Sequence, residues 1–311
     1  MKKIINLMDI LACPYCNQGV EHSSEGVEHS SEGVHCPSCI ISFPFTDDNI
    51  FDLRLKSPKK VTVTHKLNGN VNAVPPYSFY SGFLKKKQTE CIFDPAELPT
   101  HISPEMASYY PPSKSKKAIC LDLGCGNGEY RHFIEKLGYA WCGVDYSRVG
   151  APVFADAHAL PFQSDTFELI SSLAVLEHLQ FPDVALREAF RVLQPGGTFI
   201  GSVTYLVPFH DTASYYNMTH SGLINSLLDA GFDISIVGGE KNYLGIQALA
   251  YSGMFLDLKR KITYALVSPL VVLQKLWWRF KRRKQHNKFT IENECTLTTG
   301  AFIFVATKPV S

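Results

Sequence analysis

Net charge is the first thing that the sequence lacks. The 311-residue chain has 30 lysines and arginines against 29 aspartates and glutamates, which gives a formal net charge of +1. A chain of this charge has no overall field that draws it to nucleic acid or to an anionic membrane. Attraction to either partner would have to come from local clusters of charge.

Cationic side chains are absent from a long segment near the start of the chain. No lysine or arginine lies between Lys3 and Arg54, whereas eight acidic residues do. Contacts with phosphates depend on cationic side chains, so this segment is poorly suited to bind RNA. The charge pattern therefore argues against nucleic acid as a partner.

The sequence also lacks a convincing membrane-spanning or secretory segment. The uncharged run 262–274 has 13 residues and contains Pro269, whereas a membrane-spanning helix needs about 20 apolar residues. Near the N-terminus, the apolar stretch 4–11 is short and contains Asn6 and Asp9. We therefore expect neither a spanning helix nor a signal peptide.

The cysteines do not form the framework of a secreted, disulfide-rich domain. Four of the nine lie in two Cys-x-x-Cys pairs near the N-terminus, and the other five are scattered. This usage fits a reduced compartment. We therefore expect a cytoplasmic protein, and association with a membrane surface is an open alternative that depends on the C-terminal third of the chain.

The two Cys-x-x-Cys pairs predict a metal site. Cys13, Cys16, Cys36 and Cys39 form two knuckles with 19 residues between them. This spacing is typical of a four-cysteine zinc ribbon, in which the metal supplies folding energy that a short segment cannot obtain from a core. The alternative is a redox pair or unrelated thiols, and the presence of two matched pairs argues against it. Ile40 stands where a knuckle usually has glycine.

A short tandem repeat lies between the knuckles. The heptapeptide Glu-His-Ser-Ser-Glu-Gly-Val occurs at 21–27 and again at 28–34. Two copies are too few for a solenoid, so we interpret them as a duplicated hairpin tip. Because four cysteines complete a zinc site, we expect His22, His29 and His35 at the surface.

Glycine is concentrated at one point in the chain. The stretch 121–128 reads Leu-Asp-Leu-Gly-Cys-Gly-Asn-Gly and overlaps a mostly apolar run, 118–123, that is typical of a buried parallel strand. Apolar and aromatic side chains then recur with a helical period, and Gly138 is placed to end that helix. The glycines thus lie on a strand-to-helix turn, where backbone N–H groups can approach a ligand closely.

Further motifs follow at the ends of later predicted strands. A second strand, 140–144, ends in Asp145, 21 residues after Gly124. An acid at that spacing suits hydrogen bonds to ribose hydroxyls. A third strand ends in Asp156. The remaining motifs are Asp165-x-Phe167-Glu168, Leu176-Glu177-His178-Leu179 and Gln194-Pro195-Gly196-Gly197.

This ordered set resembles the class I S-adenosylmethionine (SAM)-dependent methyltransferases, and in particular those with a type 11-like domain. The resemblance implies an α/β fold with a Rossmann-like, mostly parallel sheet whose last strand is antiparallel. Segment 1–55 resembles the zinc ribbons that accompany methyltransferases. The implied organisation is a ribbon at 1–55, a connecting segment at 56–117 that packs on the core, and a methyltransferase domain at 118–311 with an insertion at about 242–297. A dinucleotide-binding enzyme is the alternative, although Glu129 stands at its third glycine position.

The resemblance also implies a set of SAM-binding residues: Asp122, Gly124, Cys125, Gly126, Asp145, Tyr146, Asp156, Ala157, Leu173 and Ala174. In that set Asp122 supports the glycine turn, and the turn lines the methionine and ribose. Asp145 binds the ribose hydroxyls, while Tyr146 lies beside adenine. Asp156 and Ala157 contact the adenine edge, and the backbone near Leu173 and Ala174 faces the methionyl amine.

Two histidines are candidates for the base that removes a proton from the methyl acceptor. His178 follows the fourth predicted strand and His210 follows the fifth, and open α/β sheets bind ligands at such strand ends. Histidine is suited to proton removal near neutral pH. His210, with Asp211 and the nearby tyrosines, resembles a segment of sugar and small-molecule O-methyltransferases. For both histidines a structural role is the alternative.

The predicted insertion has a distinctive charge pattern. After the uncharged run 262–274 comes a basic segment, 275–284, that contains Trp277 and Trp278. An apolar stretch with tryptophans and a basic end suits a membrane surface. A lid helix that packs on the protein and leaves its basic end in solvent fits the same pattern.

The sequence therefore predicts an enzyme that moves a methyl group from SAM to a hydroxyl on a small molecule or a lipid-linked glycan. SAM and one structural zinc ion are the expected cofactors. The first alternative is an rRNA or tRNA methyltransferase, favoured by the basic segment 275–288 and opposed by the acidic ribbon. The second is a non-catalytic scaffold that keeps the fold, which the two strand-end acids oppose.

Overall fold

The computed structural model describes most of the chain, in seven stretches: 5–23, 33–64, 93–148, 150–211, 213–240, 243–284 and 291–310. Most of the tandem repeat, with His29, lies outside the described residues. So does the middle of the predicted connecting segment, 65–92. Two short helices follow that gap, η3 (Pro95–Glu97) and α1 (Pro104–Ala107), and Met106 and Ala107 of α1 are buried.

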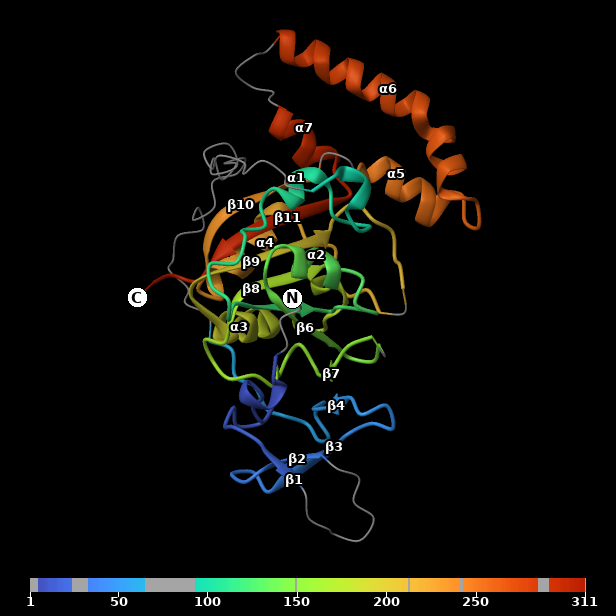
Figure 1. Ribbon diagram of the computed structural model, residues 1–311. Coiled ribbons are helices and arrows are strands. Elements are labelled where there is room, and N and C mark those ends of the chain that lie inside the picture. Colours follow the sequence, from blue (N-terminus) through green and yellow to red (C-terminus); the bar gives the residue numbers. More distant parts are fainter. Residues whose placement is uncertain are drawn as a thin grey trace.

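An eight-stranded sheet forms the centre of the molecule (Figure 1). Its order is β10-β11-β9-β8-β5-β6-β7-β4. The strands are β4 (Phe51–Asp52), β5 (Ile119–Leu123), β6 (Ala140–Asp145), β7 (Val153–Phe154), β8 (Phe167–Leu173), β9 (Leu193–Thr204), β10 (Asp233–Gly239) and β11 (Ala301–Thr307). All pairs from β9 to β4 are parallel, whereas β11 is antiparallel to both β9 and β10. The expected Rossmann-like sheet with an antiparallel last strand is therefore confirmed.

Helices connect the strands of this sheet: α2 (Arg131–Lys136), η4 (Leu176–His178), α3 (Pro182–Val192) and α4 (His220–Asp229). Proline occupies the first position of α3, where its missing N–H costs no helical hydrogen bond. Thr219 caps α4 by accepting the Gly222 N–H at 3.1 Å. Gly138 follows α2 with φ of 89°, as expected for a glycine that ends a helix.

The link between β6 and β7 contains no helix among its described residues. Parallel strands usually need a crossover of about a dozen residues, and only 146–152 stand between these two. The Asp145 carboxylate closes a tight turn instead, because its Oδ1 accepts the backbone N–H groups of Ser147 and Arg148 at 3.1 and 3.2 Å. Strand β7 is correspondingly short.

Alternate side chains of the central strands enter two separate hydrophobic clusters. Leu121 and Ile170 belong to one cluster, while their neighbours Cys120 and Leu169 belong to the other. This follows from the two-residue period of a strand, which turns successive side chains to opposite faces. A sheet buried on both faces explains why these strands read as continuous apolar runs.

The N-terminal segment forms a small sheet of its own with strands β1 (Glu21–Ser23), β2 (Gly33–Cys36) and β3 (Ile41–Pro44). Its short helix is η1 (Leu7–Asp9). The segment then joins the large sheet, because β4 pairs in parallel with β7. Ala12 N–H also donates to the Pro161 carbonyl at 2.9 Å. Leu11, Phe43 and Leu53 belong to the same hydrophobic cluster as the main core.

Both knuckles end in a residue with a left-handed backbone. Asn17 follows Cys16 with φ of 62°, and Ile40 follows Cys39 with φ of 57°. Asparagine tolerates this conformation, whereas a β-branched residue is strained in it. Ile40 therefore adopts the left-handed turn at a position where a knuckle usually has glycine, at the cost of local strain.

The segment between β10 and β11 is helical: α5 (Gly245–Leu249), the π-helix η5 (Ala250–Met254), α6 (Arg260–Lys284) and α7 (Ile291–Thr298). In Figure 1, α6 extends away from the sheet at the end of the molecule opposite the small N-terminal sheet. It has Pro269 inside it. In the described residues no helix combines the length and hydropathy needed to cross a bilayer.

Candidate cofactor pocket

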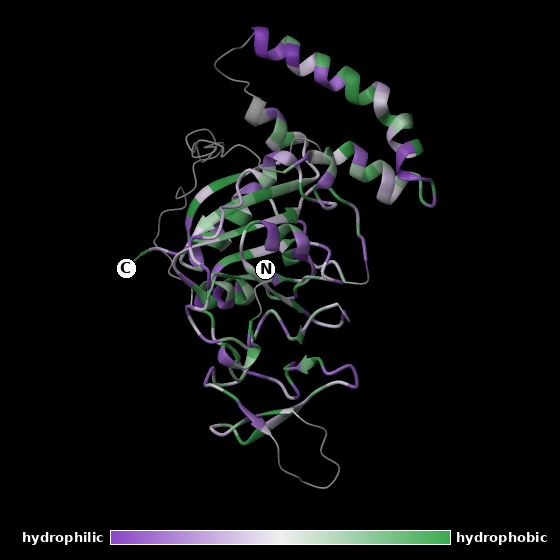
Figure 2. Ribbon diagram, in the orientation of Figure 1, coloured by the Kyte–Doolittle hydropathy of each residue, from purple (hydrophilic) through white to green (hydrophobic). Residues whose placement is uncertain are grey.

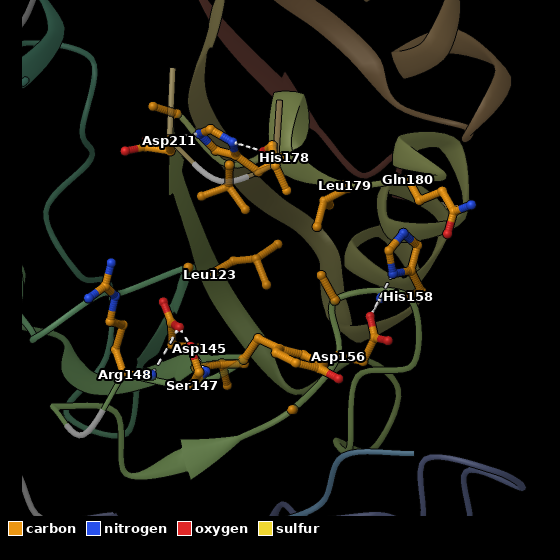
Figure 3. Close-up of a pocket in the computed structure, with 18 of the residues that line it drawn as sticks. Leu123, Asp145, Ser147, Arg148, Asp156, His158, His178, Leu179, Gln180 and Asp211 are labelled. Atoms are coloured by element: carbon orange, nitrogen blue, oxygen red, sulfur yellow. Dashed lines mark hydrogen bonds and ion pairs between the residues drawn. The ribbon is translucent and has the colours of Figure 1, made fainter. Parts of the chain in front are cut away.

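A cavity of about 720 Å³ opens at the carboxyl ends of the parallel strands (Figure 3). This is the edge at which open α/β sheets bind ligands. The residues that line it come from the ends of β5, β6 and β8, from the turn after β7 and from the loop after β9: Leu123, Gly124, Val144, Asp145, Tyr146, Ser147, Arg148, Ala155, Asp156, Ala157, His158, Ala174, Val175, His178, Leu179, Gln180, Asp211, Ala213 and Tyr215.

The glycine turn after β5 forms one wall of the cavity. Gly124 has φ of 72°, and a Cβ built on it would lie 2.4 Å from Val175 Cγ2. Only glycine fits that position, both sterically and conformationally. The N–H groups of Gly124 and Cys125 donate to the Val144 carbonyl at 2.8 and 3.0 Å, which fixes the turn against β6.

Asp122 lies beneath this turn and does not line the cavity. It is 2% exposed, and Trp141 Nε1–H donates to its Oδ2 at 2.9 Å. Burial raises the pKa of the Asp122 carboxyl to about 7, against the opposing effect of the Trp141 hydrogen bond. Its place under the turn suits the supporting role that the sequence suggested.

Asp145 joins the turns that follow β5 and β6. Besides the two N–H groups bound by its Oδ1, its Oδ2 accepts the Gly126 N–H at 3.1 Å. A carboxylate offers about four acceptor positions, so the three amides leave one for a ligand. The sequence suggested two bonds to ribose, and in this arrangement the second would require one amide to move.

Asp156 and Ala157 lie on another side of the cavity, across from Asp145 (Figure 3). Asp156 Oδ1 accepts the backbone N–H and the ring Nδ1–H of His158 at 2.9 and 2.6 Å. The ring tautomer follows from Phe181, whose N–H donates to His158 Nε2 at 3.1 Å. Burial opposes ionisation of Asp156, but these bonds hold its pKa below the ordinary value. Sequence reasoning missed His158, although an Asp-x-His spacing was available as a signal.

Tyr146 lines the cavity and is supported by the N-terminal segment. Arg54 Nη1 donates to the Tyr146 carbonyl at 3.3 Å, and its guanidinium lies 5.6 Å from the Tyr146 ring centroid. Asp52 of β4 holds Arg54 in place through a 2.5 Å ion pair, which lowers the pKa of Asp52. Arg54 could not be predicted from local sequence, because its contact spans 92 residues of chain.

The remaining SAM-site predictions divide into two groups. Gly124 and Ala174 line the cavity, and Ala174 has φ of 54°. Cys125, Gly126 and Leu173 do not line it. Cys125 is 1% exposed and packs with Ile50, Ala151 and Phe154 behind the turn.

The two histidine candidates lie next to each other at one end of the pocket. Their rings meet edge to face with centroids 5.1 Å apart, and only His178 lines the cavity. His178 Nε2 lies 3.7 Å from Asp211 Oδ2, and Figure 3 shows this pair across the cavity from Asp145. Glu177 adjoins them and is fully buried; burial raises its pKa, against partial compensation from nearby backbone N–H groups and the two imidazoles.

The four predicted metal ligands also come together. The sulfur atoms of Cys13, Cys16, Cys36 and Cys39 all lie within 4.8 Å of one another, and those of Cys16 and Cys36 are 3.6 Å apart. Zinc–sulfur bonds of about 2.3 Å place the sulfurs of a tetrahedron about 3.8 Å apart. The Cys39 N–H donates to Cys36 Sγ at 3.4 Å, which joins the second knuckle at its tip. His22 is exposed and His35 is partly buried, and the cluster contains the four cysteines.

Comparison with known proteins agrees with this architecture. Residues 121–201 match the family model described as a methyltransferase domain. A protein of Encephalitozoon cuniculi named "putative methyltransferase" is 30% identical over 42% of this chain and 77% of its own length. The chain therefore belongs to the family of class I, SAM-dependent methyltransferases.

Two longer relatives carry more specific names. The sterol 4-C-methyltransferase strm-1 of Caenorhabditis elegans is 27% identical over 46% of this chain and 44% of its own length. The tRNA (carboxymethyluridine(34)-5-O)-methyltransferase of Arabidopsis thaliana is 29% identical over 37% of this chain and 32% of its own length. The chain thus spans less than half the length of these two relatives.

The buried Asp122 carboxyl gives a pH-dependent prediction. Its pKa of about 7 in the folded protein exceeds the usual value of about 3.9 in unfolded chains. Between these values the folded protein holds a proton that the unfolded chain releases, so Asp122 makes the protein less stable as pH rises from about 4 to 7. We expect Asp122→Asn to gain roughly 2–3 kcal/mol of unfolding free energy over wild type between pH 5 and pH 8.

Denaturant unfolding of both proteins across that pH range measures the difference. Asp48→Asn, at an exposed position of the N-terminal segment, controls for loss of a surface carboxylate. Parallel pH profiles for wild type and Asp122→Asn would contradict the assignment of a protonated, buried Asp122.

Proposed function

We propose that this protein transfers the methyl group of SAM to a hydroxyl on a small molecule or a lipid-linked glycan. The observation that carries the proposal is the cavity itself. It places the strand-end carboxylates Asp145 and Asp156 on different sides of one pocket, beside a glycine turn. Two separated acceptors of this kind suit the ribose hydroxyls and the adenine amino group of one nucleoside.

In this proposal each side of the pocket holds one part of SAM. The remaining acceptor position of Asp145 binds a ribose hydroxyl, and the exposed Tyr146 ring covers the adenine. Asp156 uses Oδ2 for the adenine amino group, because His158 occupies Oδ1. The turn at Gly124 and the backbone at Ala174 leave room for the methionine portion.

Methyl transfer then needs a positioned acceptor and a base for its proton. The sulfonium of SAM is already a good leaving group, so positioning contributes much of the catalysis. His178 Nδ1–H donates to the Ala213 carbonyl at 2.5 Å, which leaves Nε2 free to accept a proton. Because His178 lines the cavity and His210 does not, we assign His178 as the base that contacts the acceptor and His210 as its neighbour.

An RNA acceptor is the second candidate, and the named tRNA methyltransferase among the relatives favours it. The basic last turn of α6, which includes Lys281 and Lys284, would supply phosphate contacts. The acidic N-terminal segment opposes this function. The sterol methyltransferase relative instead supports a lipid-like acceptor. Labelling of a cell extract with isotopic SAM separates these candidates by the class of molecule that gains the methyl group.

Removal of the Asp145 carboxylate tests the cofactor site. Asp145→Ala loses a charged acceptor for ribose and also releases three backbone N–H groups. We expect SAM affinity to fall by about 1.5–3 kcal/mol, or roughly 10–150-fold, the range for hydrogen bonds to a charged group. Isothermal titration calorimetry with SAM measures the change.

Asp145→Asn keeps the shape of the side chain and one carbonyl oxygen, so it should retain more SAM affinity than Asp145→Ala. A folded Asp145→Ala protein that binds SAM as tightly as wild type would remove Asp145 from the site. Absence of SAM binding in the wild type would favour the scaffold alternative.

We also propose that the four clustered cysteines bind one zinc ion. The sulfur separations given above support a tetrahedral site, and zinc would stabilise the small N-terminal sheet. The double variant Cys36→Ser, Cys39→Ser should lose one equivalent of zinc in metal analysis. Cys295→Ser, outside the cluster, should retain it. Full zinc retention in the double variant would exclude this ligand set.

A third proposal concerns α6, which we assign to a membrane surface. Six large apolar side chains at helical spacing are each about half exposed: Ile262, Leu266, Leu270, Leu273, Trp277 and Phe280. The neighbouring face of the helix is buried through Thr263, Val267 and Val271. Figure 2 shows the hydrophobic colour along α6 giving way to hydrophilic residues at its end. An exposed apolar stripe with a basic end suits an anionic bilayer, which a lipid-linked acceptor would require.

Liposome binding tests the α6 proposal. Full-length protein should sediment with anionic vesicles, and Leu273→Ser with Trp277→Ser should release it, because apolar burial and cationic attraction act together. Leu297→Ser, an exposed apolar position on α7, is the matched control. Equal sedimentation of the wild type and the double variant would contradict membrane binding by α6 and would favour the alternative, in which α6 is a lid that packs on the protein.

A further inference from the structure

The Glu177 carboxylate is buried, and among the described residues the backbone N–H groups near it lie outside hydrogen-bonding geometry. The residue is 0% exposed, and within the described residues neither carboxylate oxygen has a partner in hydrogen-bonding geometry. Burying an ionisable group without a partner is costly, so proteins bury carboxylates that are paired or that coordinate metals. The burial of Glu177 therefore needs an explanation that the SAM site does not provide.

Two imidazoles stand beside this carboxylate. One potential ligand atom from each of Glu177, His178 and His210 lies within 4.8 Å of the others. The three residues come from two parts of the chain, since Glu177 and His178 end η4 and His210 follows β9. The loop after β9 is fixed to η4, because the N–H groups of Tyr215 and Tyr216 both reach the Glu177 carbonyl, at 2.8 and 3.2 Å.

Both histidines use the same ring nitrogen to contact backbone. His178 Nδ1 lies 2.5 Å from the Ala213 carbonyl oxygen, and His210 Nδ1 lies 2.9 Å from the Pro208 carbonyl oxygen. Each Nδ1 is thus a donor, which leaves each Nε2 with a lone pair. Metal-binding histidines show this pattern, in which a backbone carbonyl fixes the tautomer and orients the ligand nitrogen.

We propose that Glu177, His178 and His210 bind one divalent transition-metal ion at the acceptor end of the cofactor cavity. Two imidazole nitrogens and one carboxylate form the ligand set of three-residue zinc sites that keep an open coordination position, and the same set suits other late transition metals. Bond lengths of about 2.1 Å place ligand atoms about 3.4 Å apart in a tetrahedron, so small rotations of the side chains would close the site.

The location gives the ion a role, and this step rests on the proposed methyl transfer. His178 lines the cavity, so the open coordination position faces the space for the acceptor. A hydroxyl bound to the metal at that position would lose its proton to water more readily. The oxygen then attacks the methyl carbon of SAM. An O–C bond forms, the S–C bond breaks, and sulfur keeps the electron pair as S-adenosylhomocysteine. His178 would then act as a metal ligand in place of the free base.

Metal titration of the full-length protein tests the inference. After mild chelation, Zn²⁺ is titrated in competition with a chromophoric chelator, and Co²⁺ is used in parallel as a spectroscopic probe. We expect Glu177→Gln and His210→Gln to weaken the non-thiolate site by more than roughly 100-fold, since even indirect ligand contacts matter 10–100-fold. Co²⁺ bound by nitrogen and oxygen ligands gives visible d–d bands without the charge-transfer bands of a thiolate site. These d–d bands should disappear in both variants.

The controls separate this inference from the proposals above. His132→Gln, at an exposed position of α2, should bind metal like wild type. The thiolate bands of Co²⁺ report the four-cysteine site independently, and SAM affinity reports the fold of the pocket. Equal metal affinity in wild type, Glu177→Gln and His210→Gln would overturn the site, even where SAM still binds. If Glu177→Gln fails to fold, His210→Gln decides, because His210 is only partly buried.

Discussion

The carboxylate of Asp145 is the group on which the pocket depends. Its two oxygens accept N–H groups from Gly126 after β5 and from Ser147 and Arg148 after β6. Charge-assisted bonds of this kind are about twice as strong as neutral ones, and here they replace the helix that usually links two parallel strands. The same carboxylate therefore builds the short link to β7 and lines the cavity, so a change at Asp145 affects both the link and the cavity wall.

The short link has a consequence for the N-terminal segment. A two-residue β7 is a poor edge for a large sheet, and an exposed edge strand invites pairing with another chain. Strand β4 covers it, Ile50 packs with Cys125 behind the glycine turn, and Arg54 reaches the wall of the pocket at Tyr146. Zinc bound at the cysteine cluster would stabilise the N-terminal segment. Through β4, Ile50 and Arg54, the folded segment would then hold the wall of the cavity in place.

Local sequence was sufficient where a residue's role depends on its own strand or turn. Buried parallel strands read as apolar runs, so the positions of Asp145 and Asp156 after strand ends were predicted from these runs together with the family resemblance. The antiparallel β11 followed from the family resemblance, and α6 lies within the range predicted as an insertion. The cysteine pairs were readable because metal coordination imposes a fixed spacing on the chain.

The groups that sequence reasoning missed depend on contacts between distant segments. Arg54 matters through Tyr146, and His158 matters because Phe181 fixes its tautomer. Glu177 was read only as part of a motif, yet its significance comes from burial and from His210, which no local pattern reports. Asp122 is also a buried carboxylate, but Trp141 donates to it. The absence of such a donor in hydrogen-bonding geometry at Glu177, among the described residues, is what makes two nearby imidazoles a candidate metal site in place of ordinary core packing.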